Sequence, residues 1–398
     1  MSQQALDGIR ILDFSRVLAG PLCTMTLADM GADVIKVEHP QRGDDTRQWY
    51  PPDVGGMSAY FASVNRNKQS MTLDLKHPEG QAIARQLARI SHIVVENFKV
   101  GQMARFGLDY ESLAAINPGL VYCSITGFGQ TGAYRERAGY DYVVQGMSGL
   151  MSITGEVDGE PIKVGVAISD VIAGLYATSA ILAALRHAER TGDGQHVDIA
   201  LLDTQIAALV NIASNYLVSG DTPPRYGNQH QNIVPYQTFK ARDGAFVLAV
   251  GNDRQFKLLC HLIQRPQLAE DTRFTTNPAR VAHRATLIPI LAQAFAERTV
   301  ADWVELLTEA GIPAGAINTV AQALNTPQVQ DRHLVQAVEL ETGDSLQLVG
   351  SPLKLSQTPP RKPSAPPRLG QHTDAILSAL LGLSVQAIDD LRQAQVIA

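Results

Sequence analysis

The first 126 residues alternate between short apolar runs and helix-like segments, and this alternation restricts the fold more than any other feature. Residues 8–15 and 32–38 are predicted strands. Between them, residues 21–31 form a predicted helix that begins at a proline and ends at a glycine. A strand, a helix and a strand joined by short links make a βαβ unit, which requires parallel strands and a right-handed crossover.

The same alternation continues along the chain. Further strands are predicted at 70–75, 92–96 and 120–126, with helices at 78–90 and 110–116. This pattern predicts an α/β fold with a doubly wound, Rossmann-like large domain, in which ligands bind at the carboxyl ends of the strands.

Basic and polar side chains follow the predicted strands at that edge. They are Arg16, His39, Lys76 and the run Asn97, Phe98 and Lys99. The first 105 residues carry 12 Lys and Arg against 11 Asp and Glu, a net charge of +1. The remaining residues carry a net charge of −7, so the total is −6. These features predict a site for a phosphorylated ligand, although each cation could equally be a solvated surface charge.

The later chain predicts a second, smaller α+β domain. A strand at 195–200 and a long helix at 202–218 complete the first part of the large domain, residues 1–220. Residues 226–330 form the predicted smaller domain, which starts with a β-hairpin whose turn is Asp243–Gly244. Residues 331–398 are the predicted return linker and C-terminal part of the large domain.

The stretch around Asp170 is the strongest candidate for chemistry. Ser169 is a good helix N-cap, and an uninterrupted run of apolar or small residues occupies positions 171–185. A helix that is apolar on all sides should be buried, and the positive end of its dipole should favour an ionised Asp170. Ala173 and Gly174 share the face of Asp170 and should leave room beside it. The alternative is that Asp170 is only a second cap.

Residues 127–132 read GFGQTG, a literal G-x-G-x-x-G after a strand. A dinucleotide fingerprint should open an apolar helix, but three charges and a further glycine come first, so a mobile glycine loop is the competing interpretation.

Other chemistries lack their motifs. There is no G-x-S-x-G, phosphate loop, H-E-x-x-H or C-x-x-C motif, and the histidines are scattered, so we expect no metal and no nicotinamide cofactor. Three dispersed cysteines indicate a reducing compartment. The net charge of −6 argues against a nucleic-acid partner. The absence of a signal sequence and an apolar run of fewer than about 18 residues predict a cytoplasmic protein with no membrane partner.

Motifs along nearly the whole chain resemble the class III coenzyme A transferases (CaiB/BaiF type), which include formyl-CoA transferase and carnitine CoA-transferase. The matching segments are LDFSRVLAGP, GDDTR, VNRNKQS, LDLKHPEG, ENFKVG, GYDYVVQGMSG, the Asp170 stretch and LGQHTD. The resemblance implies that Asp170 attacks an acyl-CoA thioester and that the chain forms an interlocked homodimer. It implies that Arg16, Val17 and Leu18 line the CoA channel, Leu73 and Lys76 hold the adenine nucleotide, Asn97, Phe98 and Arg105 lie along the pantetheine and phosphates, and Tyr140 lies near the thioester.

The chain also departs from the family pattern. His39 and Ala138 stand where formyl-CoA transferases carry basic residues, and Arg137 is the expected substitute. The tetraglycine lid is replaced by YGNQHQNIVPYQTF, which is more similar to the succinate–hydroxymethylglutarate (glutarate) CoA-transferase branch. Tyr140 occupies the position of the racemase histidine, which argues against proton shuttling.

We therefore expect a transferase that moves CoA from an acyl-CoA donor, succinyl-CoA, to a small acid such as glutarate, 3-hydroxy-3-methylglutarate or itaconate. Arg47 and Arg105 are the candidates for binding a distal carboxylate, with Tyr140, Gln145 and His230 as further substrate contacts. The alternatives are an oxalate-type CoA-transferase, an acyl-CoA racemase or lyase, an NAD-dependent dehydrogenase and a non-catalytic CoA-binding protein.

Overall fold

The computed structural model describes residues 4–398, which form two compact units. Of these residues, the first unit contains 4–150, 163–221 and 328–398, and the second contains 151–162 and 222–327. The division predicted from the sequence placed residues 151–162 in the large domain and residues 328–330 in the smaller one, whereas in the structure 151–162 belong to the second unit and 328–330 to the first.

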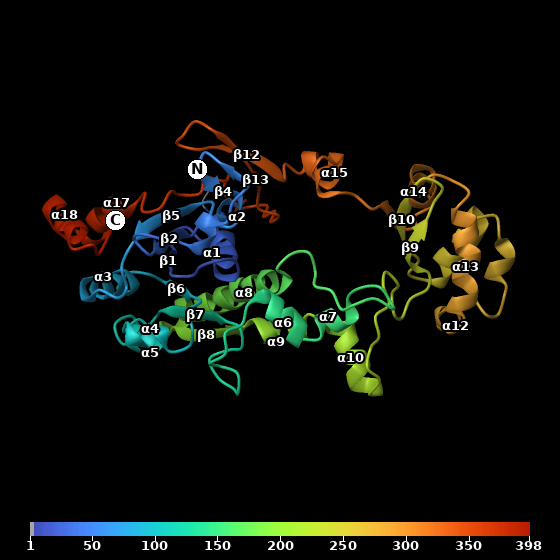
Figure 1. Ribbon diagram of the computed structural model, residues 1–398, viewed down its shortest axis with the longest axis horizontal. Helices are drawn as coiled ribbons and strands as arrows, with labels where there is room; N and C mark the ends of the chain where they lie inside the picture. Colours follow the sequence, from blue (N-terminus) through green and yellow to red (C-terminus); the bar gives the residue numbers. More distant parts are fainter. Residues whose placement is uncertain (1–3) are drawn as a thin grey trace. The chain divides into compact units, whose positions relative to one another are not determined.

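A parallel sheet of six strands forms the centre of the first unit (Figure 1). Its strands are β1 (Arg10–Asp13), β2 (Asp33–Glu38), β5 (Lys68–Thr72), β6 (Ile93–Glu96), β7 (Val121–Thr126) and β8 (Gln195–Ala200). The spatial order is β5-β2-β1-β6-β7-β8, which corresponds to the doubly wound order 3-2-1-4-5-6 when these six strands are counted along the chain. The predicted parallel α/β sheet is confirmed.

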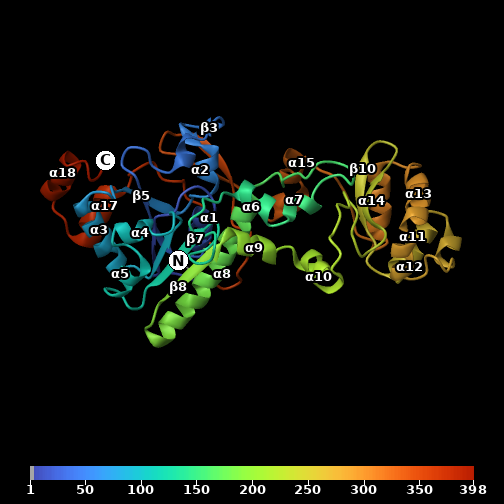
Figure 2. The ribbon, with the colours of Figure 1, turned by 60° about the horizontal axis from the view of Figure 1, so that its bottom comes forward.

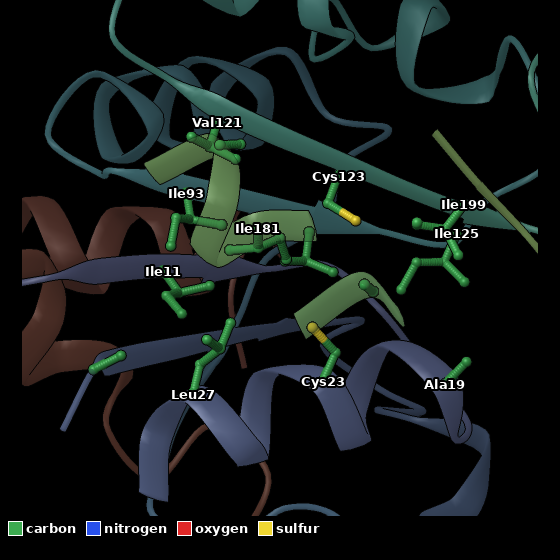
Figure 3. Close-up of a cluster of buried hydrophobic side chains, with 14 of the residues drawn as sticks. Ile11, Ala19, Cys23, Leu27, Ile93, Val121, Cys123, Ile125, Ile181 and Ile199 are labelled. Carbon is green, nitrogen blue, oxygen red and sulfur yellow. The ribbon is translucent and has the colours of Figure 1, made fainter. Parts of the chain in front are cut away.

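Side chains alternate between the two faces of this sheet, so each face has its own core. Helices α1 (Ala19–Asp29) and α8 (Ile168–Thr191) cover the first face, where side chains of α1 and the sheet meet Ile181 of α8 (Figure 3). The second face packs against α3 (Pro78–Arg89), α4 (Gln102–Arg105), α5 (Tyr110–Ala114), α17 (Thr373–Leu381) and α18 (Val385–Gln393).

The last residues of the chain return to the first strands of the sheet. Helix α17 contacts α3 and β5 (Figure 1), and Ile397 is only 2% exposed. The Asp74 amide donates to the carbonyl of Val396 at 2.8 Å, and the Ala398 amide donates to Thr72 Oγ1 at 2.9 Å. The second core is therefore built from both ends of the chain.

Helix α8 differs from the expected all-round buried helix. Ala173, Ala177 and Ile181 on one face are fully buried, whereas Leu175 and Tyr176 on the other are about half exposed. Figure 2 shows α8 alongside β7 and β8. With 24 residues, α8 is also long and apolar enough to cross a membrane, contrary to the expectation from the apolar run. Core helices pass the same test, and the inner face of α8 packs in the first core.

The long helix predicted at 202–218 is two helices, α9 (Leu201–Ala207) and α10 (Val210–Ser219). The chain breaks where Val210 adopts a φ of +43°, a left-handed conformation that is rare for a β-branched residue. No glycine or proline marks this break in the sequence.

Shorter elements complete the first unit. They are the strand pair β3 (Asp53–Val54) and β4 (Met57–Ser58), the pair β12 (Val335–Glu339) and β13 (Ser345–Val349), the 3-10 helix η1 (Asp45–Gln48), and α2 (Ala59–Ser63) and α6 (Asp141–Met147). Helix α2 packs against β13, and Phe61 of α2 is fully buried between them and their neighbours.

The second unit contains an antiparallel sheet of β9 (Tyr236–Lys240), β10 (Ala245–Ala249) and β11 (Ala314–Ala316). The predicted hairpin is confirmed, because the Ala241 amide donates to the Gly244 carbonyl at 2.8 Å. The core includes α11 (Asp253–Leu262), η2 (Pro266–Ala269), α13 (Arg284–Phe295) and α14 (Val300–Glu309), and α12 (Asn277–Ala282) and α15 (Val320–Leu324) accompany it. Helices α7 (Leu150–Ile153) and α16 (Pro327–Asp331) span the boundaries between units.

Candidate active site

The turn after β1 lies where the strand order of the sheet reverses. β1 and β6 are neighbours, and the helices that follow them cover opposite faces, so a crevice opens at their carboxyl ends. The Arg16 amide donates to Asn97 Oδ1 at 2.9 Å, and Asn97 Nδ2 donates to the Arg16 carbonyl at 2.7 Å. The Asn97 side chain therefore binds the protein backbone, where the resemblance implied a contact with CoA.

A hollow of about 930 Å³, open to solvent, lies at the carboxyl ends of β1, β2 and β5; it is hereafter the β1–β5 hollow. Leu73, Phe98 and Phe106 line it with apolar surface, and the two phenylalanine rings meet edge to face at 6.5 Å. Arg42 and Lys76 also line it and form no ion pair with any of residues 4–398. Apolar walls beside unpaired cations fit an adenine base and its phosphates.

The other basic groups of this hollow are already engaged. Arg16 forms an exposed ion pair with Asp45 at 3.3 Å. His39 Nδ1 accepts the amide proton of Gln41 at 3.2 Å, which leaves Nε2 as the nitrogen that carries the proton in the neutral ring. Arg42 is therefore the free guanidinium of the hollow among the described residues, and the sequence analysis did not select it.

The structure brings together part of the predicted CoA site. Five of the predicted residues line the β1–β5 hollow: Arg16, His39, Leu73, Lys76 and Phe98.

Other predicted CoA contacts lie elsewhere. Val17 and Leu18 follow Arg16 on the turn and are half-buried, and Lys99 lines a different hollow. Arg105 is exposed. Arg137 stacks on the Tyr134 ring at 3.8 Å, in the exposed loop that precedes α6. Tyr140 directly precedes α6 and is 72% exposed.

Asp170 is half-buried in the first turn of α8. The helix begins at Ile168, so Ser169 is not its N-cap. Asp141 of α6 accepts the Ser169 amide proton at 2.8 Å, and the Ser169 hydroxyl donates to Gln205 Oε1 at 2.9 Å. A carboxylate from another helix thus caps α8 beside Asp170.

Burial and, to a smaller extent, the nearby Asp141 carboxylate together raise the pKa of Asp170 to about 7. The helix dipole was expected to keep Asp170 ionised, but desolvation and a second acid at the same helix end outweigh it. Asp170 forms no ion pair with any of residues 4–398. It is a partly buried carboxylate with a pKa raised to about 7 and no cation paired with it among residues 4–398.

The small residues after Asp170 serve packing rather than substrate space. A Cβ atom at Gly174 would lie 2.7 Å from the Ala19 carbonyl oxygen, so the glycine lets α1 approach α8 closely. The expectation that Ala173 and Gly174 leave room beside Asp170 is wrong at these positions, because α1 fills that space.

Two predicted substrate contacts, Arg47 and Gln145, form hydrogen bonds with other groups of the protein. Arg47 binds both carboxylate oxygens of Glu38 at 2.7 Å, donates to the Pro367 carbonyl at 3.1 Å and covers the Phe61 ring at 3.7 Å. Gln145 is fully buried. Its Nε2 donates to Asp141 at 2.8 Å, and its Oε1 accepts the Val164 amide proton at 2.9 Å. Both side chains hold segments in place in this structure, and their contact with substrate stays a prediction.

His230 belongs to the second unit. Its Nδ1 accepts the Asn232 amide proton at 3.0 Å, and its ring lies 5.1 Å from that of Tyr236. Its substrate role stays a prediction.

A second hollow of about 730 Å³ lies against β6, β7 and the exposed face of β8; it is hereafter the β6–β8 hollow. Ser124 Oγ lies 2.9 Å from His196 Nε2, and the His196 ring stacks on Tyr110. Burial raises the pKa of Glu96 to about 7, against the opposing hydrogen bonds from Ser124 and the Phe98 amide. Within residues 4–398, no cluster of three or more His, Cys, Asp or Glu could hold a metal ion.

The GFGQTG segment forms a loop, not a helix entrance. Gly127 and Gly139 approach so closely that a Cβ atom at Gly127 would lie 2.6 Å from the Gly139 Cα. Gly127 and Gly139 therefore bring together the two ends of an exposed loop. The next element is the seven-residue helix α6. This arrangement supports the glycine-loop interpretation over a dinucleotide fingerprint.

Sequence reasoning missed Tyr60, Asp141 and Asp44. Burial raises the pKa of Tyr60, and the Asp170, Asp141 and Asp44 carboxylates add to the shift, so all three lie within electrostatic range of one hydroxyl. The GDDTR and GYD motifs contain Asp44 and Asp141 and were the available signal. Tyr60 lies in no motif that marks it.

The chain belongs to CoA-transferase family III, whose model matches residues 6–373. It is 50% identical to the succinate–glutarate CoA-transferase of Agrobacterium fabrum over 94% of this chain and 95% of that protein. It is 44% identical to the human succinyl-CoA:glutarate CoA-transferase over 98% of this chain and 90% of that protein. A crystal structure of a CaiB/BaiF family protein from Brucella suis matches with a TM-score of 0.84 and 47% identity, covering 95% of this chain and all of that one. The predicted family resemblance is confirmed.

Proposed function

We propose that this enzyme transfers CoA from succinyl-CoA to glutarate, or to a related dicarboxylic acid, through a covalent intermediate on Asp170. The observation that carries the proposal is the state of Asp170: half-buried, without a cation partner, and with a pKa raised to about 7. Such a carboxylate is a stronger base and nucleophile when ionised than one with an ordinary pKa.

Each half of the reaction exchanges one acyl bond for another. The Asp170 carboxylate attacks the thioester carbonyl of succinyl-CoA, the C–S bond breaks, and a mixed anhydride and CoA thiolate form. The thiolate then attacks the Asp170 carbonyl, which releases succinate and leaves Asp170 as a CoA thioester. The acceptor carboxylate attacks this thioester, expels the thiolate and forms a second mixed anhydride with Asp170. The thiolate finally attacks the acceptor carbonyl of this anhydride, which gives the new acyl-CoA and regenerates the Asp170 carboxylate.

The β1–β5 hollow would hold the nucleotide end of CoA. Leu73 and Phe98 supply apolar surface for the base, and Arg42 and Lys76 supply unpaired charge for phosphate groups. Arg42 would provide a fixed charge beside His39. With Arg47 bound to Glu38, Arg105 is the remaining predicted arginine for the distal carboxylate of the acceptor.

The named activities of the relatives support succinate and glutarate as the acids. The exposed apolar side chains of the first unit support a homodimer, because large apolar surfaces on a protein mark interfaces. They include Tyr142, Val143 and Met147 on α6, Leu175 and Tyr176 on α8, and Leu217 and Val218 on α10.

The test is incubation of the enzyme with succinyl-CoA and one acid at a time, with mass spectrometry of the thioester formed. The panel is glutarate, 3-hydroxy-3-methylglutarate, itaconate and oxalate. We expect glutaryl-CoA to form fastest, and hydroxylamine to trap Asp170 after donor is added alone. Product formation with no adduct at Asp170 would replace the covalent route with direct exchange, and a preference for oxalate would identify the oxalate-type activity instead. Light scattering at several concentrations would test the dimer.

A further inference from the structure

The turn after β1 is held by side chains of β1 and of other segments. The Ser15 amide donates to Asp13 Oδ1 at 2.9 Å, and Lys36 Nζ donates to the Ser15 carbonyl at 2.8 Å. Asn97 binds both the amide and the carbonyl of Arg16. The Val17 amide donates to Asp44 Oδ1 at 3.2 Å. Every one of these backbone groups is therefore satisfied by a specific side chain rather than by regular secondary structure.

Val17 adopts a φ of +70°, in the left-handed region. A β-branched residue there is a genuine outlier that strains the backbone. Such a conformation persists only where the surrounding structure fixes it. The hydrogen bond from the Val17 amide to Asp44 is the contact that acts on the strained residue itself.

Asp44 is fixed by a buried ion pair. Its Oδ2 lies 2.9 Å from Lys36 Nζ, and neither side chain is exposed to solvent. Thr46 donates to Asp44 Oδ1 from both its amide and its hydroxyl, at 3.0 and 2.8 Å. The carboxylate that holds the Val17 amide is thus fully ligated and cannot rotate without breaking several bonds.

The turn connects the β1–β5 hollow with the Asp170 helix. Arg16, at one end of the turn, lines the hollow. Ala19 follows three residues later, and its carbonyl packs against Gly174 of α8, one helical turn beyond Asp170. A shift of the turn would therefore change the position of the hollow relative to the nucleophile.

We propose that Asp44, clamped by Lys36, is a positioning residue that holds the strained Val17 turn so that a thioester anchored in the β1–β5 hollow meets Asp170. This inference rests on the proposed function. It assigns to the buried Asp44–Lys36 pair an effect on the rate of transfer beyond its contribution to stability, because misplacement of reacting groups by about 1 Å lowers rates up to about 100-fold.

The test compares two buried ion pairs that flank α1. Asp44→Asn removes the charge beneath the turn. Asp29→Asn removes the charge from the Asp29–Arg66 pair, which is also buried but lies at the other end of α1, ten residues or roughly 15 Å from Ala19. Both variants should lose thermal stability. We expect Asp44→Asn to lower kcat at least 10-fold with a change in the KM for succinyl-CoA below 3-fold, and Asp29→Asn to leave kcat within 2-fold of wild type.

Thr46→Val is the milder second variant, because it deletes one donor to the Asp44 carboxylate and keeps the side-chain shape. We expect it to lower kcat about 3-fold and leave KM unchanged, and it decides the question if Asp44→Asn does not fold. Equal kcat values for Asp44→Asn and Asp29→Asn, or a wild-type kcat for Thr46→Val where Asp44→Asn gives no folded protein, would overturn the inference. Failure of the proposed function gives a different result, since the wild-type enzyme would then transfer no CoA between these acids.

Discussion

Two carboxylates near the same tyrosine have opposite electrostatic surroundings. Burial alone would raise the pKa of Asp44, but Lys36 and the Thr46 hydrogen bonds outweigh it and hold the pKa at about 2. Asp170 is also desolvated, but its charged neighbour is Asp141 instead of a lysine, and its pKa rises to about 7. Asp44 therefore carries a charge that is paired with Lys36 and holds the backbone of the turn. Asp170 carries a charge with no paired cation among the described residues. Groups whose surroundings separate their pKa values in this way have separate roles.

The largest expected effect concerns Asp170 itself. Asp170→Asn removes the nucleophile while keeping its shape, so we expect CoA transfer to fall by roughly 10⁴-fold or more. The matched control is Asp203→Asn, which makes the same change at an exposed residue of α9 and should keep wild-type activity. Residual transfer above about 1% of wild type in Asp170→Asn, by the mass-spectrometric assay, would remove the contrast on which the comparison depends.

The two carboxylates should affect stability with opposite sign. Asp44→Asn leaves the Lys36 ammonium buried without its partner, which costs about 3–5 kcal/mol. Asp170 has a folded-state pKa near 7 against an ordinary value of 3.8, so the folded protein binds the extra proton between these values and loses stability as the pH rises through that window. Asp170→Asn should therefore raise Tm at pH 8 and raise it less at pH 5. Thermal denaturation of both variants at the two pH values tests this, and a lowered Tm for Asp170→Asn at pH 8 contradicts it.

Removing Asp141 should make Asp170 more like an ordinary carboxylate. We expect kcat to rise with pH through about 7 in the wild-type enzyme, because the ionised form attacks. Asp141→Asn keeps an oxygen for the Ser169 amide and deletes the repelling charge, so the midpoint should move down by about one pH unit. The pH–rate profile of kcat measures this. An unchanged midpoint in a folded variant would mean that desolvation alone sets the pKa of Asp170.

The smallest effect should come from the far end of the hollow. Arg42→Ala should raise the KM for succinyl-CoA about 5- to 10-fold and leave kcat unchanged. The lost charge-assisted contact to phosphate is remote from the reacting thioester, so it contributes to binding and not to the chemical step. Arg89→Ala, at an exposed arginine of α3 outside the hollow, is the control. With succinyl-dephospho-CoA, the effect of Arg42→Ala should disappear if Arg42 binds the 3′-phosphate and persist if it binds the diphosphate. An unchanged KM with succinyl-CoA would show that Arg42 binds neither.

The layout of the sheet could be predicted from the sequence because it depends on the local alternation of apolar strands and helical segments. Pro21 and Gly31 each lie two residues from an end of α1, and the run of alternating elements predicted a parallel sheet and its ligand-binding edge. Arg16, His39, Lys76 and Phe98 followed from that edge. Local signals left two interpretations of Asp170, and the family motifs favoured the nucleophile.

The pairing of charges could not be read in the same way. Arg42 lies in the turn after β2 and Arg47 lies five residues later in η1, yet Arg42 forms no ion pair within residues 4–398 and Arg47 is bound to Glu38, Pro367 and the Phe61 ring. The cap on α8 comes from Asp141, 28 residues before Ser169. These partners are set by tertiary contacts between distant segments, and no pattern within one segment encodes them. The break in the helix after Ala207 likewise depends on a single left-handed valine.

The return of residues 373–397 to the sheet has a consequence for synthesis of the protein. β1, β2 and β5 leave the ribosome more than 300 residues before side chains such as Ile376, Leu377 and Ile397, which close one side of them. Until residues 373–397 emerge, the nascent sheet presents bare apolar surface, which is the kind of surface that chaperones bind and that drives aggregation. The emergence of residues 373–397 is therefore the step at which this unit can complete its core.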